Sequence, residues 1–416
     1  MSSNGFKDKR KSKFKVKYLT IENLDDFNNL LRYAFQVTNN ELINLGYSEE
    51  ELKQAKKPIL EKAKVLAWFD EEKLASQIAV YPMNVNIHGV IYKMAGVTAV
   101  ATYPEYSNMG LMNDLMIQSI EEMRKEGQTI SFLYPYSIPF YRRKGWEVVS
   151  DKISFSLKDS QLPKTKSVNG RVERVEYNHK DLIHIYNEFS KSRHGALIRT
   201  DLEWEEYWRW EVDDTIVAIY YDNDDKPKGF LIYVLDNDVF KIKEMIYLNN
   251  EARIEIWNYI SAHYSMVDMV KGYNYTNDPI AFLLDDSEIK ETIRPYIMAR
   301  ITDVKEFIIK YPFLKKPKNR KINLVIEDNM AKWNNKNFII YFDENKNTIC
   351  KRLNKKYNKN TKYTIKMNIQ TLTTMLMSYK TPSYLYNIGR IEASKSAIKL
   401  LESMIPKTQA YFSDYF

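Results

Sequence analysis

The sequence lacks several features that define common classes of protein. Its single cysteine, Cys350, excludes an internal disulfide and favours a reducing compartment. No apolar run approaches the ~18 residues that a membrane-spanning helix needs. The polar and basic start, residues 1–17, contains no apolar stretch like that of a secretory signal. The sequence therefore predicts a cytoplasmic protein with no membrane span.

Histidines are also scarce, and the basic residues gather in runs. The five histidines lack metal-ligand spacing, which predicts no metal site and makes them surface or hydrogen-bonded core residues: His88, His179, His184, His194 and His263. Lysine and arginine total 62 against 54 for aspartate and glutamate, and the excess lies at residues 7–17, 315–321 and 351–362. Aromatic residues are not interleaved with these runs, so solvated surface is favoured over binding to nucleic acid or to an anionic membrane.

What the sequence does contain is a strand–turn–helix–strand pattern at residues 97–146. An apolar strand at 97–102 leads through a turn ending in Gly110 to a helix at 111–125, and then to a second apolar strand at 130–134. The first N–H groups of a helix have no internal partner, and Gly110 has no Cβ, so a diphosphate could approach the backbone there. Most such units merely build a sheet, so the pattern alone leaves both interpretations open.

The flanking segments predict an order that occurs twice. Several elements lead into residue 97: a strand at 14–19, helices at 24–35 and 49–64, and hairpins at 65–80 and 81–94. After a polar connector at 151–167, strands and helices follow in a similar order up to residue 263, which we interpret as a diverged internal repeat. The equivalent turn of the repeat, residues 247–252, lacks glycine and contains Glu251. The second copy is therefore expected to line the substrate side rather than to bind phosphate.

Two segments of residues 97–146 resemble the acetyl-CoA site of the GNAT N-acyltransferases, and more narrowly that of the Eis (enhanced intracellular survival) family. They are residues 97–110, VTAVATYPEYSNMG, and residues 138–146, IPFYRRKGW. Residues 294–304 and 384–391 resemble two further segments of that family. The resemblance implies an α/β and α+β fold with tandem GNAT-like domains and a third domain like the sterol carrier proteins, a likeness of fold rather than of sterol binding. It divides the chain into a disordered basic leader, an acetyl-CoA-binding GNAT domain, a degenerate GNAT-like domain and the third domain: residues 1–13, 14–150, 151–293 and 294–416.

The resemblance also implies an activity. Members of the family use acetyl-CoA as acyl donor and acetylate primary amines, so the expected substrates are polycationic small molecules such as aminoglycosides, and the expected assembly is a homo-oligomer, a hexamer. Two alternatives stay open: a degenerate, non-catalytic module that binds acyl-CoA weakly or serves in interactions, and a lipid-binding protein that works through the third domain. The helix at 202–211, with three tryptophans among glutamates, could line a pocket for a polycationic amine, although an ordinary amphipathic helix is favoured.

Two groups are expected to carry the proton transfers. Tyr141 matches the catalytic tyrosine of the family and is the candidate general acid, against the alternative of a packed aromatic with its hydroxyl bonded to backbone. The α-carboxylate of Phe416 is the candidate proton acceptor by resemblance, because the family's terminal carboxylate enters the active site. The aromatic-rich end of the chain, YFSDYF, looks suited to docking, whereas most termini are loose.

The cofactor contacts that the resemblance carries over lie on the first strand, the turn, the helix start and the catalytic end: Val100, Ala101, Thr102, Asn108, Met109, Gly110, Leu111, Met112, Asn113, Tyr136 and Ser137. Backbone N–H groups at residues 100–102 are expected to meet the thioester carbonyl. The turn departs from the family because Ser107-Asn108-Met109 stands where the family has arginines. Losing one charge-assisted contact would weaken affinity about tenfold to a hundredfold, unless Lys or Arg from elsewhere compensates.

Overall fold

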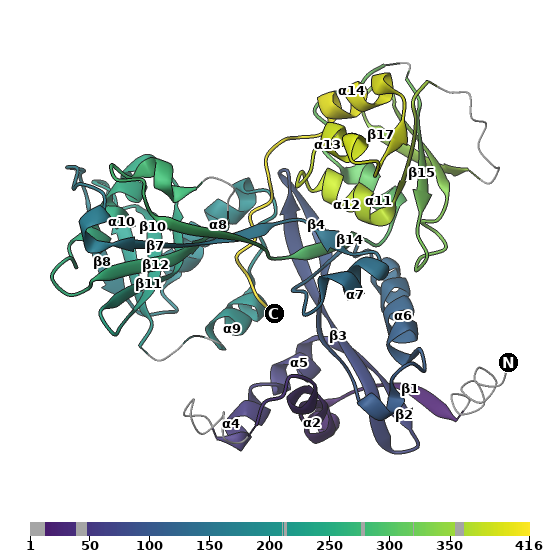
Figure 1. Cartoon of the computed structure of the whole chain (residues 1–416), viewed down its shortest axis with the longest axis horizontal. Helices are drawn as coiled ribbons and strands as arrows, with labels where there is room; N and C mark the ends of the chain where they lie inside the picture. Colours follow the sequence, from purple (N-terminus) through teal and green to yellow (C-terminus); the bar gives the residue numbers. More distant parts are fainter. Residues whose placement is uncertain are drawn as a thin grey trace.

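The computed structural model describes residues 13–38, 48–209, 211, 214–275, 279–318, 320–353 and 362–416 (Figure 1). The predicted leader, apart from Lys13, lies outside these residues, as do Trp210 and most of the basic run at 351–362. Among the described residues, no helix combines the length and the apolar character needed to cross a membrane. The strands form three sheets of seven, seven and five strands, which follow one another along the chain. One strand from a later part of the chain returns to the first sheet, as described below.

The first sheet has the predicted antiparallel meander followed by a parallel pair. Its strands lie in the order β1(Phe14–Tyr18), β2(Lys64–Asp70), β3(Lys73–Ile87), β4(Val90–Thr102), β5(Ile130–Leu133), β14(Met298–Ile301) and β6(Glu147–Val148). The two predicted hairpins at 65–80 and 81–94 are not separate, because β3 runs unbroken for 15 residues and pairs with β4 along its length. The predicted helix at 49–64 is divided into α4(Glu49–Gln54) and α5(Lys57–Lys62), with Pro58 in the first turn of α5.

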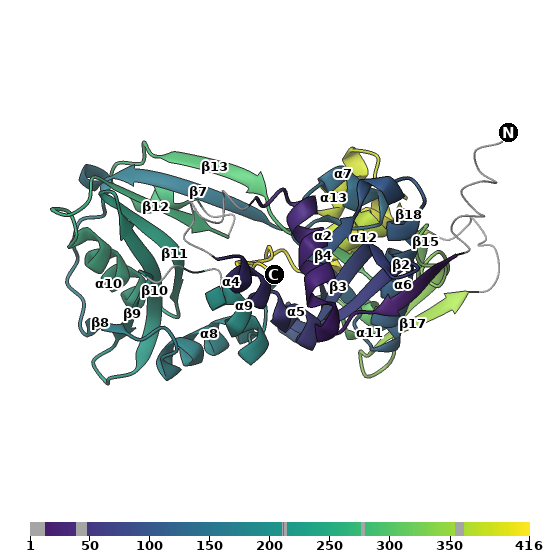
Figure 2. The same cartoon turned by 90° about the horizontal axis from the view of Figure 1, so that it is seen from below.

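Helices cover both faces of the first sheet, as the alternation of its side chains requires. Helix α2(Leu24–Ala34) packs with the residues of β2 that point to one face, and α6(Leu111–Lys125) packs with those that point to the other. Figure 2 shows α2 lying across β3 and β4. Helix α6 has the bounds that the sequence predicts, because its buried residues recur at helical spacing: Leu115, Met116, Ser119, Ile120 and Met123.

The second sheet repeats the plan of the first. Its order is β13(Lys290–Pro295), β7(Asp151–Lys158), β12(Met269–Asn274), β11(Val239–Tyr247), β10(Pro227–Asp236), β9(Ile216–Tyr221) and β8(Arg171–Val175). The parallel pair β11–β12 is joined through α10(Asn250–Ser261), as β4–β5 is joined through α6. Two more helices, α8(Lys180–Ser192) and α9(Asp201–Arg209), lie on the side that faces the first domain (Figures 1 and 2).

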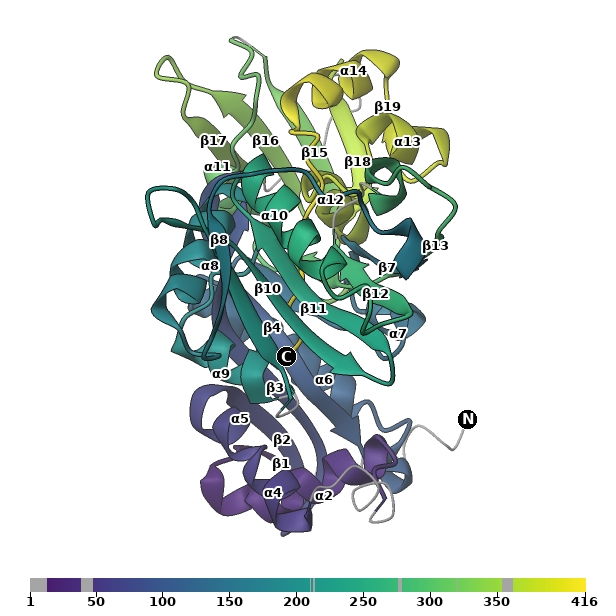
Figure 3. The same cartoon turned by 90° about the vertical axis from the view of Figure 1, so that its left-hand side faces the viewer.

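The third domain is a five-stranded sheet with helices. The strand order is β17(Thr348–Leu353), β16(Asn337–Phe342), β15(Ile322–Glu327), β18(Thr364–Asn368) and β19(Glu392–Ala393). The helices are α11(Val304–Lys310), α12(Ile369–Leu376), α13(Pro382–Asn387) and α14(Lys395–Met404). Figure 3 shows this domain at one end of the molecule, with α2, α4 and α5 at the other.

The sheets do not divide where the sequence predicts the third domain to begin, between residues 293 and 294. Strand β13 continues to Pro295 in the second sheet, and β14 then returns to the first sheet between β5 and β6. All four residues of β14 are buried, so the first sheet is completed by a strand about 150 residues further along the chain. Local pattern cannot reveal such a distant pairing partner, so the sequence does not indicate that β14 belongs to the first sheet.

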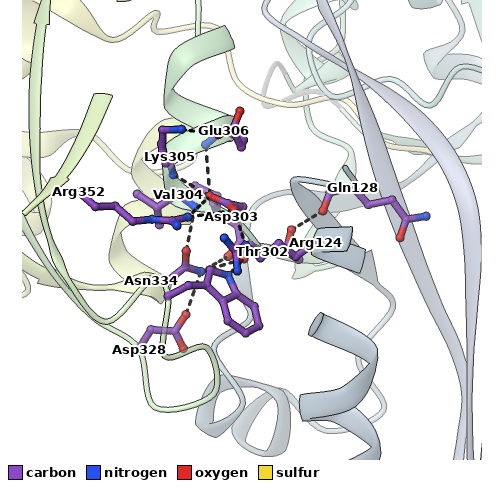
Figure 4. Close-up of polar contacts among 12 residues, drawn as sticks. Arg124, Gln128, Thr302, Asp303, Val304, Lys305, Glu306, Asp328, Asn334 and Arg352 are labelled. Atoms are coloured by element: carbon purple, nitrogen blue, oxygen red, sulfur yellow. Dashed lines mark hydrogen bonds and ion pairs between the residues drawn. The ribbon is translucent and has the colours of Figure 1, made fainter. Parts of the chain in front are cut away.

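Asp303 fixes the third domain to the first (Figure 4). Its carboxylate caps α11 by accepting hydrogen bonds from the N–H groups of Lys305 and Glu306. The same carboxylate pairs with Arg124 of α6 at 2.7 Å and with Arg352 of β17 at 3.0 Å. Next to it, the hydroxyl of Thr302 donates to the carbonyl of Gln128. One buried acid therefore ties the start of the third domain to the helix that lies beside the candidate site.

The last segment of the chain leaves the third domain again. After α14, residues 405–416 run without regular structure back between the first two domains, and the chain ends beside β3 and β4 (Figure 1). Most of its apolar side chains are buried, including Tyr411, Phe412 and Phe416. The expectation of a docked terminus therefore agrees with the structure.

Candidate active site

The site begins where β4 and β5 diverge. The two parallel strands pair only over Met94–Gly96 and Ile130–Phe132, and β4 then continues to Thr102 beside β3 alone. A β-bulge accompanies the divergence, since Ala79 opposes Thr98 while Gln77 opposes Ala101. Ala99, in the bulge, has the left-handed φ of 52°. The splay predicted at residues 100–102 is present, and it leaves backbone groups on that edge of β4 without a strand partner among the described residues.

The turn before α6 offers further free donors. Asn108 and Gly110 adopt left-handed φ values of 61° and 78°, and α6 begins immediately afterwards at Leu111. The N-cap residue of this helix is Gly110, which has no side chain to bond the leading N–H groups. A 15-residue helix with such an N-terminus favours an anion there.

A cavity of about 630 Å³ lies along the open part of β4. It brings together eight of the predicted residues: Val100, Ala101, Thr102, Met112, Tyr136, Ser137, Tyr141 and Phe416. The rest of the wall is mostly aromatic or apolar and includes Phe35, Tyr134 and Tyr415. The other five predicted residues, Asn108, Met109, Gly110, Leu111 and Asn113, do not line it but form the turn and the first turn of α6. Leu111 is 1% exposed, so its side chain belongs to the core and is not available to a ligand.

Tyr141 lies on α7(Ile138–Arg143), near the point where the two strands separate. Its ring makes edge contacts with Phe140 and Trp146, at centroid distances of 5.1 and 6.4 Å. Burial raises the pKa of Tyr141 to about 12. No hydrogen bond joins its hydroxyl to another described residue, so the alternative of a hydroxyl tied to backbone does not hold. Such a hydroxyl keeps its proton at neutral pH and can donate it.

The final residue docks through its ring. The Phe416 side chain is 9% exposed and makes an edge contact with Phe412, at a centroid distance of 6.3 Å. A Cβ placed on Gly96 would lie 2.9 Å both from Cε2 of Phe416 and from Sδ of Met83. The ring therefore rests directly against the backbone of β4, at the last residue before that strand parts from β5. This close approach explains why glycine stands at position 96.

A buried ion network holds the residues just before the terminus. Arg199 is fully buried, and its guanidinium pairs with Asp414 at 2.7 Å and with both oxygens of Glu244 at 3.0 Å. The Ser413 hydroxyl donates to Glu244, and the Tyr296 hydroxyl donates to the carbonyl of Asp414 at 2.8 Å. Sequence analysis missed this network, because its partners come from residues 199, 244 and 414. The sequence signal for this network is Asp414, an acid within the mostly aromatic end of the chain, residues 411–416.

Lys144 is a second residue that the sequence analysis missed. Its ammonium donates to Oδ1 of Asn113 at 2.5 Å, which brings a cation to the first turn of α6. Burial, and then the positive charge of Arg143, lower the pKa of Lys144. The arginine-poor turn therefore has a cation beside it, supplied by the IPFYRRKGW segment. The uncapped helix start, Gly110, Lys144 and the open strand edge together fit a diphosphate followed by an extended chain.

Four of the five histidines have structural partners, as predicted for core or surface residues. His88 and His194 stack at 3.5 Å; the ring of His194 also meets the Met377 carbonyl, and that of His88 the Ser378 hydroxyl, so the pair joins all three domains. His179 caps α8, and the ring of His263, just after α10, bonds the carbonyl of Tyr259 in that helix, whereas His184 is exposed. Over the described part of the chain, no group of three or more His, Cys, Asp or Glu residues could hold a metal ion.

The tryptophan-bearing segment forms the predicted amphipathic helix, α9. Trp204 packs 4.6 Å from the Arg199 guanidinium, while Trp208 and Glu205 line a separate open hollow of about 820 Å³. Two glutamates of this hollow are already neutralised, because Glu205 pairs with Lys62 and Glu211 with Lys243. The hollow therefore offers less negative charge to a polycation than the sequence suggests.

Comparisons with known proteins agree with this architecture. Residues 15–149 and 195–301 each match an acetyltransferase (GNAT) domain family, and residues 304–413 match a sterol carrier protein domain family. The search of curated protein sequences found no match. The chain therefore has tandem GNAT domains followed by a sterol-carrier-like domain, which confirms the predicted fold class.

Solved structures resemble the chain over nearly its whole length. A probable N-acyltransferase of Enterococcus faecalis is 27% identical, with a TM-score of 0.87 over 97% of this chain and 99% of that one. A GCN5-related N-acetyltransferase of Anabaena variabilis is 22% identical, with a TM-score of 0.82 over 97% and 100%. Eis1 of Mycobacterium abscessus is 16% identical, with a TM-score of 0.77 over 97% and 100%, which is a likeness of fold.

Proposed function

Since the chain is a GNAT-type acyltransferase, we propose that it transfers the acetyl group of acetyl-CoA to a primary amine. One observation carries the proposal. The open edge of β4, the hydroxyl of Tyr141 and the last residue of the chain, Phe416, all border one cavity. Acyl transfer from a thioester to an amine needs donors for the carbonyl, a proton acceptor for the amine and a proton donor for the thiolate, and these three groups supply them.

The donor would be held by the helix start and the open strand. Bound acetyl-CoA supplies an activated acyl group on a good leaving thiol. The leading N–H groups of α6 and the Lys144 ammonium suit the diphosphate of acetyl-CoA. The Lys144 cation takes the place of the arginines that the turn lacks. The edge of Val100, Ala101 and Thr102 that faces away from β3 can bond the extended arm and meet the carbonyl.

Two groups would move the protons. The carboxylate of Phe416 takes a proton from the substrate's ammonium group, directly or through one water, because it ends a chain that is docked at the cavity wall. The amine formed in this way then attacks the thioester carbonyl. The Tyr141 hydroxyl gives its proton to the departing thiolate. Burial raises the pKa of Tyr141 to about 12, so the hydroxyl holds its proton at neutral pH and has it available when the thiolate leaves.

The residues that line the acyl-transfer cavity favour cationic, compact amines as acceptors. Rings of Phe35, Tyr134, Tyr136 and Tyr415 line the cavity, and ammonium groups bind to such faces by cation–π attraction. Amines with several cationic groups, such as aminoglycosides, are therefore the leading substrate class that we propose. The Arg143 side chain also lines the cavity and opposes very high positive charge, which favours acceptors that present one amine at a time.

Thiol release on mixing the protein with acetyl-CoA and a panel of amines tests the proposal. We expect turnover with one or more cationic amines, and Tyr141→Phe should lower kcat by about 10²–10⁴ while leaving coenzyme A binding intact. Release no faster than background for every amine, with Tyr141→Phe indistinguishable from wild type, would contradict it. A non-catalytic binding module would then be the better account.

We also propose that the protein is a cytoplasmic homo-oligomer, a hexamer as the resemblance implies. Closed symmetry is the usual form of soluble assemblies. The single cysteine is buried at 2% exposure, which suits a chain that needs no disulfide. Light scattering at micromolar concentration should give a hexamer mass, and a monomer mass would refute the assembly.

A further inference from the structure

The second domain contains its own pair of parallel strands that diverge, and a cavity lies between the diverging strands. Strands β11 and β12 pair only over Val239–Lys241 and Met269–Lys271, after which β11 continues beside β10 alone. A cavity of about 650 Å³ lies where they part, between the end of β11, the end of β12, α8 and α10. It is distinct from the acyl-transfer cavity, with which it shares no lining residue.

The walls of this second cavity are largely aromatic. Phe155 of β7, Trp257 of α10, Tyr275 and Tyr411 are all at most 8% exposed where they line it. At its rim Phe282 is 92% exposed, an unusual position for a large apolar side chain. Such a combination suits a flat or chain-like apolar body that enters past the rim and is buried against rings.

Two arginines give the cavity a net positive charge. Arg193, at the end of α8, lines it; its guanidinium lies 5.8 Å from the centroid of the Phe189 ring and has no ion pair or hydrogen bond with a described residue. Arg253 of α10 lines it as well, and within the described part of the chain its guanidinium bonds only the side-chain oxygen of Asn250. The acid in the wall, Glu244, is already paired with Arg199. Among the residues that the structure describes, neither of these two cations has a carboxylate partner.

The helix beside the cavity argues against a copy of the coenzyme site. The side chain of Asn249 already accepts a hydrogen bond from the N–H of Ala252 at 2.8 Å, which caps the start of α10. Glu251 adds a negative charge in the first turn. Both helices have an acid in the first turn, Asp114 in α6 and Glu251 in α10, but only α10 has an N-cap side chain that already occupies a leading N–H group, so a diphosphate has fewer donors there.

We propose that this second-domain cavity binds an amphipathic organic anion, with its apolar body against the rings and its carboxylate-type head on Arg193 and Arg253. The inference is independent of the acyl transfer, because it rests on residues of another cavity. The proposal predicts that a ligand needs both an anionic head group and an apolar body to bind this cavity. A neutral ligand of the same shape should bind far less tightly, because the two arginines would stay unpaired.

The test uses fluorescence of 1-anilinonaphthalene-8-sulfonate with the full-length protein. We expect saturable binding, displaced by decanoate and not by 1-decanol at the same concentration. The double variant Arg193→Gln/Arg253→Gln should raise the Kd for decanoate about tenfold or more, whereas Arg193→Lys/Arg253→Lys should retain most of the affinity. Far-ultraviolet circular dichroism establishes that each variant is folded.

Two arginines outside the cavity serve as matched controls. Arg174 is exposed on β8 of the same domain, and Arg143 lines the acyl-transfer cavity. Arg174→Gln and Arg143→Gln should each leave the decanoate Kd unchanged. The proposal is overturned if no saturable binding occurs, if decanol competes as well as decanoate, or if Arg143→Gln weakens binding while the double variant does not.

Discussion

The contact between Gly96 and Phe416 allows the position of the terminus to be disturbed without touching its charge. In Gly96→Ala, the new methyl group would lie 2.9 Å from Cε2 of Phe416 and 2.9 Å from Sδ of Met83. Ordinary carbon contacts lie at about 3.5–4.0 Å, so the ring must retreat by roughly 0.5–1 Å. Overpacking of this kind costs about 1–3 kcal/mol of stability. A displacement of about 1 Å at a reacting group lowers the rate by about a hundredfold.

The assay is steady-state thiol release together with urea denaturation. Gly96→Ala should lose most of its kcat, whereas Gly229→Ala should keep the wild-type kcat. Gly229 is a matched control because a Cβ there would be equally crowded, 2.9 Å from Ile256 Cδ1, but in the second domain. The double variant Gly96→Ala/Phe416→Leu should recover activity, since a smaller side chain makes room for the methyl group. A wild-type kcat in Gly96→Ala would refute the argument that the docked ring positions the carboxylate.

Three further predictions concern charges around the site. Lys144→Gln should raise the Kd for coenzyme A about tenfold to a hundredfold in titration calorimetry, with Lys144→Arg near wild type; equal affinities would remove Lys144 from the site. Arg199→Gln should cost about 3–5 kcal/mol in urea denaturation, because it leaves buried carboxylates unpaired, and a cost below about 1 kcal/mol would show that the network is dispensable. Burial lowers the pKa of His88 to about 3 and that of His194 to about 4, below the usual 6.5. Both must stay neutral in the fold, so stability should be complete above pH 6.5 and fall below it, by up to about 1.4 kcal/mol per pH unit for each histidine; equal unfolding free energies at pH 7 and pH 5 would contradict this.

Local features of the sequence predicted those parts of the fold that depend on neighbours in the chain. Gly110 and the apolar spacing after it located α6 to the residue, since a left-handed turn and helical periodicity are both local signals. The order of strands also revealed the internal repeat, and eight of the site residues predicted from the family resemblance line one cavity.

Features that depend on distant pairing could not be predicted in this way. Strand β14 completes a sheet begun hundreds of residues earlier, and no local pattern says which edge a buried strand joins. Lys144 reads as one of three successive basic residues until the fold places it on Asn113. Arg199 looks like any surface arginine in the sequence, and only the fold shows it buried between two carboxylates.

The central claim is that the chain's own terminal carboxylate accepts the proton of the amine. The most direct measurement compares kcat for the native protein with that of a protein extended by a short C-terminal tag, using the same tag at the N-terminus as control. The extension converts the Phe416 carboxylate to an amide, so kcat should fall by about 10²–10⁴ while coenzyme A binding is retained. Phe416→Leu, which keeps the carboxylate in register, should lose much less. An unchanged kcat in the C-terminally tagged protein would contradict the account, and the terminus would then be docked without taking part in the reaction.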